Sequence, residues 1–248
     1  MKKILKNKII IIYFIYTLFL VSSSLYFILI NKHRDSLMSF LFIFIIPSFY
    51  LVQRILNIEF RFIFKTLILL IASGGVLGAS YDLYHIIPFF DDVLHTLSGF
   101  IFCLLGYSIV EYYFVIDNKR KFNGAILMSS FFSLSIGLIW ELFEFTLNVL
   151  FGFDMLADTI IPRFNSYLLS NTHSYYLSFN NIKRTIIEYG NNEVYIINNG
   201  YLDLGSLDSM IDMSVCLLGV LLFMFITLIS DKYNLKINNY LLSKRKKN

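Results

Sequence analysis

Six long apolar segments limit what this chain can fold into more than any other feature. They cover residues 9–30, 37–52, 62–80, 93–116, 124–151 and 209–230, with charged or Gly/Asn-bearing breaks between them. A helix needs about 20 apolar residues to cross the hydrocarbon core of a bilayer. Only 15% of the 248 residues are charged, whereas a soluble domain has about 25%. The sequence therefore predicts an all-α, polytopic membrane helix bundle with about six transmembrane helices.

Two of the six segments leave an alternative open. Segment 37–52 is short and contains Pro47, so it is either a kinked span or a re-entrant segment. The first segment follows several lysines, as the core of a secretory signal does. Its apolar run continues through Leu25–Ile30, however, which is long for a signal core. We expect both segments to be helices of the bundle.

The basic residues predict how the helices are oriented, because cytoplasmic loops retain Lys and Arg. With the N-terminus inside and six crossings, 16 of the 21 basic residues fall on the inner side. Both termini are therefore expected to face the cytoplasm. The basic inner face should meet the headgroups of anionic membrane lipids. No feature of the chain indicates a nucleic-acid surface.

Residues 152–207 form the one sizeable extramembrane stretch, and it is rich in Asn, Tyr and Ser. Within it Thr185–Tyr189 and Glu193–Ile197 flank Gly190-Asn191-Asn192, which is typical of a β-hairpin with a three-residue turn. We expect an extracytoplasmic insert between the fifth and sixth helices of a single integral membrane domain covering residues 1–248. The insert is either a lid over the outer face or a mobile surface loop.

Three short clusters place six acids and one histidine at the edges of the apolar segments. The clusters are Asp91-Asp92-Val93-Leu94-His95, Glu141-Leu142-Phe143-Glu144 and Asp208-Ser209-Met210-Ile211-Asp212. An ionised side chain in the middle of a membrane helix costs about 2.5–3.5 kcal/mol on insertion scales. We infer that these groups share one polar site on the outer side of the membrane.

In the fourth predicted helix, Asp91 and His95 are four residues apart and so lie on one face, which Ser98 and Gly99 continue. An Asp one turn before a His can accept its ring N–H and orient the other nitrogen toward a metal or substrate. The alternative is that Asp91 and Asp92 cap the helix, because acids are favoured at its N-terminus.

In the fifth predicted helix, Glu141, Glu144 and Asn148 share one face. Two carboxylates this close in a medium of low dielectric constant require a bound proton or a cation. The alternative is a carboxylate that a neighbouring helix neutralises purely for packing. In the sixth helix, Asp208 and Asp212 are four residues apart, and the first of them is either a ligand or a cap.

A shared site would combine one imidazole with several carboxylates, a mixture that suits Zn²⁺ or Mn²⁺, or a proton-coupled site if no metal binds. Glu144 should lie about 10 Å from the end of its helix at 1.5 Å per residue, so the site forms only if the fifth helix tilts or projects. The expected metal ligands are His95, Asp91, Asp212 and Asp208, and the expected catalytic residues are Glu141 and Glu144.

Two further polar features are weaker candidates. Asp82 and His85 precede the first cluster and could join the site from above, or they could be ordinary exposed loop residues. Glu111 is 16 residues beyond His95 on the same predicted helix. It should lie about 24 Å away and form a separate feature.

The order Phe90-Asp91 to His95, then Glu141-Leu142-Phe143-Glu144-Phe145, then Asp208 and Asp212-Met213 with Gly219, resembles the YjdF-like bacterial membrane proteins of unknown function. The resemblance covers about residues 85–220, and the layout is more distantly similar to VanZ-like envelope proteins. Members of the YjdF-like group commonly have a basic residue where this chain has Asp92, so the site here is more acidic. The resemblance implies a bacterial cytoplasmic-membrane protein and no established activity.

Three classes of function fit these features. The first is a membrane enzyme in which a bound metal activates water for attack on an envelope or lipid-linked substrate, with Glu141 or Glu144 as general base. The second is a proton- or cation-coupled transporter that uses the same carboxylates. The third is a scaffold whose polar cluster only holds helices together. The inner halves of the helices offer few polar groups, which favours an outer-facing pocket over a conduit.

Overall fold

The computed structural model of the chain describes residues 2–153, 155–170, 172, 174–190 and 192–245. Six helical spans in this part of the chain are long and apolar enough to cross a membrane, as predicted. They are α1 (Lys2–Leu29), α2 (His33–Phe42) together with α3 (Ile45–Ile55), α4 (Phe62–Ser80), α6 (Phe90–Tyr113), α7 (Lys119–Phe151) and α8 (Ser206–Lys232). Two short helices, α5 (Leu83–Ile86) and α9 (Asn238–Leu241), join or follow them.

The second span is longer than the sequence indicated, because α2 and α3 together cover His33–Ile55. The helix is interrupted at Ile43 and Phe44, where the backbone N–H groups bond to carbonyls three residues back instead of four. Pro47 explains this position, since it lacks an N–H and is tolerated only in the first turn of a helix. The span is therefore two helices in series, long enough for a full crossing.

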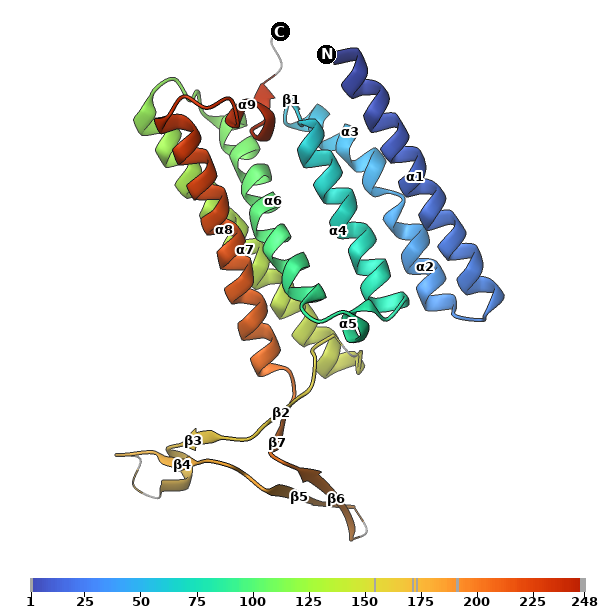
Figure 1. Cartoon of the computed structure of the whole chain (residues 1–248), viewed down its shortest axis with the longest axis vertical. Helices are drawn as coiled ribbons and strands as arrows, with labels where there is room; N and C mark the ends of the chain where they lie inside the picture. The colour runs from blue at the N-terminus through green and yellow to red at the C-terminus, as the bar shows by residue number, and fades with distance from the viewer. Residues whose placement is uncertain (1, 154, 171, 173, 191, 246–248) are drawn as a thin grey trace. The chain divides into compact units, whose positions relative to one another are not determined.

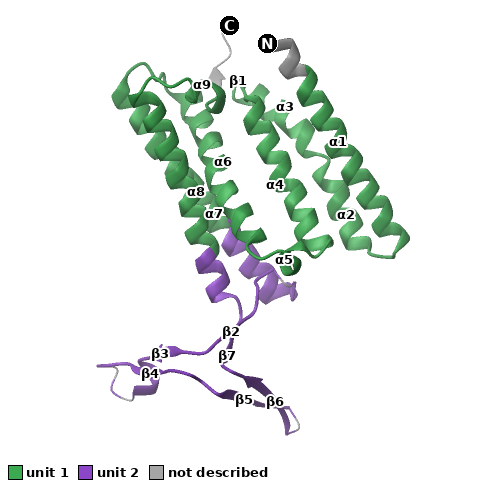
Figure 2. Ribbon diagram, viewed as in Figure 1, with its two compact units in different colours: residues 1–139, 212–248 green, residues 140–211 purple. Residues whose placement is uncertain are grey.

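The chain divides into two compact units, coloured separately in Figure 2. Unit 1 consists of residues 1–139 and 212–248, and unit 2 consists of residues 140–211. The boundaries fall inside α7 and α8, so each of these helices contributes to both units.

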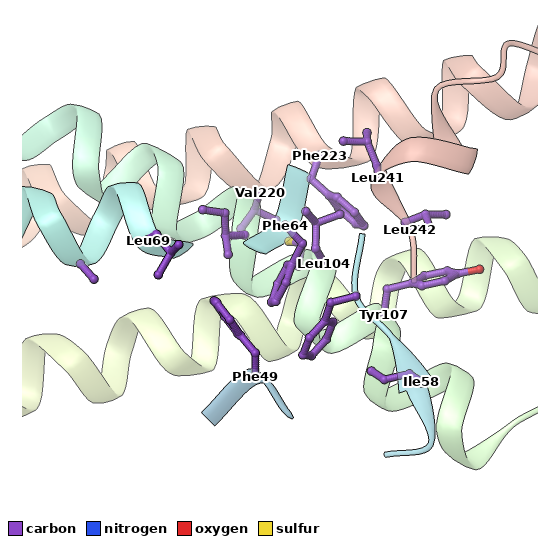
Figure 3. Packing of buried hydrophobic residues seen from close by; sticks show 14 of the residues in the cluster. Phe49, Ile58, Phe64, Leu69, Leu104, Tyr107, Val220, Phe223, Leu241 and Leu242 are labelled. Atoms are coloured by element: carbon purple, nitrogen blue, oxygen red, sulfur yellow. The ribbon is translucent and has the colours of Figure 1, made fainter. Parts of the chain in front are cut away.

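The core of unit 1 is built from large apolar side chains of distant segments. Figure 3 shows Phe49 of α3, Phe64 of α4 and Leu104 of α6 beside Val220 and Phe223 of α8. Outside this core, α1 and α2 expose many apolar residues; Phe14, for example, is 67% exposed. In a membrane helix this outward face lies against lipid, so its exposure needs no protein partner.

One end of unit 1 is closed by the C-terminal segment, an arrangement that the sequence did not predict. Strand β8 (Lys244–Arg245) pairs with β1 (Ile58–Glu59), and α9 and β1 lie at the same end as the start of α1 (Figure 1). Arg61 Nε donates to the Leu242 carbonyl at 2.9 Å. Ser243 Oγ donates to Glu111 at 2.8 Å. The described basic residues of the predicted inner side belong to segments at this end, whereas Lys246 and Lys247 lie outside the described residues.

Unit 2 carries short antiparallel strand pairs. They are β2 (Thr159–Ile161) with β7 (Tyr201–Asp203), β3 (Phe164–Ser166) with β4 (Leu177–Phe179), and β5 (Arg184–Tyr189) with β6 (Glu193–Asn198). A 3₁₀ turn at Leu168–Ser170 lies between β3 and β4. The predicted hairpin is confirmed, since Tyr189 pairs with Glu193 across the turn. Phe164 stacks on Phe179 at 4.8 Å between ring centroids and meets Tyr201 edge-on, which joins two of the pairs.

Candidate functional site

The start of α6 brings the first predicted pair together. His95 Nε2 lies 3.6 Å from Asp91 Oδ1, one helical turn away. The His95 side chain is 13% exposed and that of Asp91 is 40% exposed, so Asp91 is the more accessible member of the pair. The N-cap residue of α6, Phe89, makes no side-chain cap hydrogen bond. Asp91 faces His95 along the helix, as the spacing predicted, and the cap role considered for Asp91 and Asp92 stays a prediction.

The first part of α8 adds a third group. Asp212 is only 3% exposed. One carboxylate oxygen of Asp212, one of Asp91 and one ring nitrogen of His95 all lie within 4.8 Å of one another. All three residues belong to unit 1. Two helices far apart in the sequence thus place an imidazole and two carboxylates in one cluster, which we call the Asp–His cluster.

Glycines allow α6 and α8 to come this close. A Cβ on Gly99 of α6 would overlap the carbonyl oxygen of Cys216, and a Cβ on Gly219 of α8 would overlap that of Thr96. Small residues at such contacts let membrane helices approach backbone to backbone. His95 is one turn from Gly99, and Asp212 is one turn from Cys216. The close contact therefore sets the separation of the cluster.

The part of α7 that belongs to unit 1 packs on the same contact. Ser133 Oγ donates to the Gly99 carbonyl at 2.7 Å. A Cβ on Gly137 would lie 3.0 Å from Cys216 Sγ. Three helices thus meet around Gly99, Gly137 and Cys216. Gly137 was not among the residues expected at this contact, although a small residue one turn before Glu141 was the available signal.

The geometry of the Asp–His cluster fits a divalent transition metal. Nitrogen and oxygen ligands bind Zn²⁺ at about 2.0–2.2 Å, so two ligand atoms of one tetrahedral ion lie roughly 3.3–3.6 Å apart. The three atoms lie within 4.8 Å of one another, so the widest separation has to shorten by at most about 1.5 Å. Side-chain rotation, which is freest for the partly exposed Asp91, can supply this change. One imidazole with two carboxylates is a ligand set typical of Zn²⁺ or Mn²⁺.

Glu141 and Glu144 lie on α7 in unit 2 and are 6% and 9% exposed. They are three residues apart, so they share one face of the helix. The helix is 33 residues long, which corresponds to about 50 Å against a hydrocarbon core of about 30 Å. It therefore has the excess length that the predicted shared site requires.

Asp208, a predicted ligand, has a structural contact in unit 2. Its Oδ2 accepts a hydrogen bond from the Ala157 N–H at 2.8 Å, which fastens the loop that leaves α7 to the start of α8. Asp203 also acts at the start of α8, because its Oδ2 accepts from the Leu207 N–H at 2.8 Å. The cap role considered for Asp208 stays a prediction, and so does its metal role.

The weaker candidates lie outside the Asp–His cluster. His85 Nδ1 and Asp82 Oδ1 are 2.6 Å apart, and the two side chains are 78% and 66% exposed. They pair with each other at the short helix α5, which contains His85 and has Asp82 as its N-cap residue. Glu111 accepts from Ser243 at the end of unit 1 that the C-terminal segment closes. It is a separate feature, as the helix length predicted.

A family model described as "Predicted membrane protein (DUF2238)" matches residues 10–162. The match covers more than half of the chain, from within α1 to beyond the end of α7. It contains Asp91, His95, Glu141 and Glu144 but not Asp212. No curated protein and no solved structure matches the chain. The family description states a membrane location and no activity.

Proposed function

We propose that this chain, which belongs to the DUF2238 family of predicted membrane proteins, binds a divalent metal ion at the Asp–His cluster and uses it to hydrolyse an envelope or lipid-linked substrate. The single observation that carries the proposal is the gathering of Asp91, His95 and Asp212 within 4.8 Å. Asp212 is almost fully buried in a span, where placing a carboxylate is costly. A bound cation would lower this cost.

The proposal includes Glu141 and Glu144 as the catalytic carboxylates. The support for this part is that α7 continues as one helix beyond the contact that it makes with α6 and α8 at Gly99, Gly137 and Cys216. One turn from that contact, in the direction of the predicted outer face, α6 has His95, α8 has Asp212 and α7 has Glu141. On a regular α7, Glu141 follows Gly137 by one turn and Glu144 follows it by two, and the proposal assigns both carboxylates to this chemistry.

Each residue then has a distinct chemical part. A bound divalent ion would supply a Lewis acid to the substrate. Asp91, the most exposed ligand, would accept the imidazole N–H or bind the ion directly, and would leave the open side for substrate. Glu141 or Glu144 would take the proton of the attacking water, because a carboxylate held in a buried setting is a suitable general base. The topology proposed from the basic residues places this reaction at the outer surface of a bacterial cytoplasmic membrane, which is consistent with the resemblance of residues 85–220 to YjdF-like proteins.

Metal content of the purified protein tests the proposal. We expect about one Zn²⁺ or Mn²⁺ per wild-type chain and little in His95→Ala. The matched control is His85→Ala, which removes an exposed histidine whose partner is Asp82 and should leave the metal in place. Absence of stoichiometric metal from the wild type, or equal loss in both variants, would contradict the proposal.

A cation- or proton-coupled transporter is the second candidate, and the burial of Asp212 favours it, since intramembrane acids often bind a transported ion. Uptake of a divalent ion into proteoliposomes that depends on Asp212 would support transport. Metal that stays bound without any flux would favour the enzyme. Loss of folded protein in Asp212→Asn, with no metal in the wild type, would instead support a scaffold.

A further inference from the structure

A narrow groove with a volume of about 400 Å³ runs between α1 and α4 of unit 1. Its floor is formed by Tyr16 and Leu69, which are 4% and 3% exposed. Its rim includes Ile15 and Leu70, which are 59% and 53% exposed. The groove is therefore a feature of the lipid-facing surface of two membrane spans.

The polar atoms beside the groove are already bonded within the protein. Thr66 Oγ1 and Ser73 Oγ donate to carbonyls one turn back on α4, at 3.0 and 2.9 Å. The Tyr16 hydroxyl donates to the Phe42 carbonyl at 2.8 Å. These groups offer little to a polar ligand, so the groove favours a hydrocarbon.

The dimensions of the groove select a thin occupant. Its lining extends from Thr66 to Leu77 on α4, which is about 16 Å of helix. The groove has a volume of about 400 Å³ over that length, so it is long and narrow. A single alkyl chain can lie along a groove of this shape.

Two lysines lie where the groove opens toward the start of both helices. Lys8 is one turn before Ile12 on α1, and Lys65 is one turn before Leu69 on α4. Residues four apart share a helix face, so both ammonium groups belong to the groove side of their helices. Lysines beside the membrane surface attract anionic lipid headgroups.

We propose that this groove is a binding site for an anionic phospholipid, with one acyl chain between α1 and α4 and the phosphate at Lys8 and Lys65. The apolar lining would bind the acyl chain of the lipid, and the two lysines would bind its negatively charged headgroup. The site is independent of the Asp–His cluster, because it uses different helices and no metal. It predicts that lipid headgroup charge, rather than lipid in general, decides occupancy.

Native mass spectrometry of the full-length protein in detergent tests this site. The probes are phosphatidylglycerol and phosphatidylcholine with identical acyl chains. We expect phosphatidylglycerol to be retained roughly tenfold more strongly, and the double variant Lys8→Gln/Lys65→Gln to remove most of that preference. The matched control is Lys236→Gln, which removes an exposed positive charge away from the groove and should change nothing.

The acyl-chain part of the proposal has its own variant. Ser73→Phe fills the groove, and the serine hydroxyl bonds only to its own helix, so folding should persist. We expect weaker retention of both lipids. An unchanged spectrum for Ser73→Phe would overturn the assignment of the groove. If Lys236→Gln reduced the preference for phosphatidylglycerol as much as the double variant does, the preference would come from the net charge of the protein and not from this site. If the protein were a dimer that Ser73→Phe dissociates, the occupant of the groove would be a second copy of the protein.

Discussion

Gly99 of α6 and Cys216 of α8 lie so close that a methyl group on residue 99 would overlap the Cys216 carbonyl oxygen. One turn from each of them are His95 and Asp212, two members of the Asp–His cluster. The helix–helix contact and the chemistry are therefore coupled. The separation of the two ligands is set by residues that carry no functional group.

Replacing Gly99 by Ala should separate α6 from α8. Forced overpacking costs about 1–3 kcal/mol, so we expect a lower thermal unfolding temperature in detergent and loss of bound metal. Gly124→Ala on α7 is the matched control, because nothing lies within 4 Å of a Cβ there. It should be neutral or stabilise by up to about 1 kcal/mol through helix propensity. Equal stability of the two variants would show that the close contact is unimportant.

The two carboxylates of the cluster should contribute unequally to metal binding. Asp212 is 3% exposed, whereas the Asp91 side chain is 40% exposed. A buried ligand is held in place by packing, while an exposed one can be replaced by water. We expect Asp212→Asn to remove the metal and Asp91→Asn to weaken binding by about 10–100-fold, as for residues that orient a ligand. Metal titration of both apo-proteins measures this, and a larger loss for Asp91→Asn would reverse the assignment.

Cysteine cross-linking tests whether the three acidic clusters share a site. In a background without Cys103 and Cys216, a short bifunctional thiol reagent should join cysteines at positions 95 and 212, and at positions 95 and 144. A cysteine pair at positions 95 and 111 is the negative control, since 16 residues of one helix separate them by about 24 Å. Failure of the 95–144 pair alone would remove Glu144 from the site and retain the Asp–His cluster.

The C-terminal closure of unit 1 should contribute to stability. Ser243 is 6% exposed and donates to Glu111. Removing a buried hydrogen-bond partner costs about 1–3 kcal/mol, so Ser243→Ala should lower the unfolding temperature. Ser135→Ala is the control, because that exposed serine bonds only to the Phe131 carbonyl of its own helix. The metal content of both variants should stay at the wild-type value.

The proposed orientation can be tested by labelling intact cells. Single cysteines at Lys32 and Lys183 should react with a membrane-impermeant thiol reagent, because both positions are exposed and belong to predicted outer segments. A cysteine at Lys236 should react only after permeabilisation, as expected for the basic inner side. Labelling of Lys236→Cys in intact cells would invert the topology and place the Asp–His cluster at the cytoplasmic face.

Several features followed from the sequence because they depend on local chemistry. Apolar runs of sufficient length gave the six spans, since a bilayer demands internal hydrogen bonding over about 20 residues. The hairpin of β5 and β6 followed from its turn residues, and the spacing of Asp91 and His95 from helix periodicity. For α2 and α3, Pro47 identified the region of the kink. The span reaches residues 33 and 55, further than predicted, because the charged residues at its two ends interrupt the apolar pattern.

The sequence by itself thus determined the spans, their apolar faces and which helix carries each polar group. Tertiary structure decided the rest, because it depends on pairs of residues far apart in the chain. Asp212 lies near His95 because α6 and α8 touch at Gly99 with Cys216 and at Gly219 with Thr96. The residue spacing within either helix cannot predict this distance between two helices. Local sequence patterns also did not predict that β8 pairs with β1, or that Asp208 accepts a hydrogen bond from Ala157. The spacing of residues along one helix determines which face of that helix a side chain occupies. The packing between helices determines which residues of other helices that face contacts.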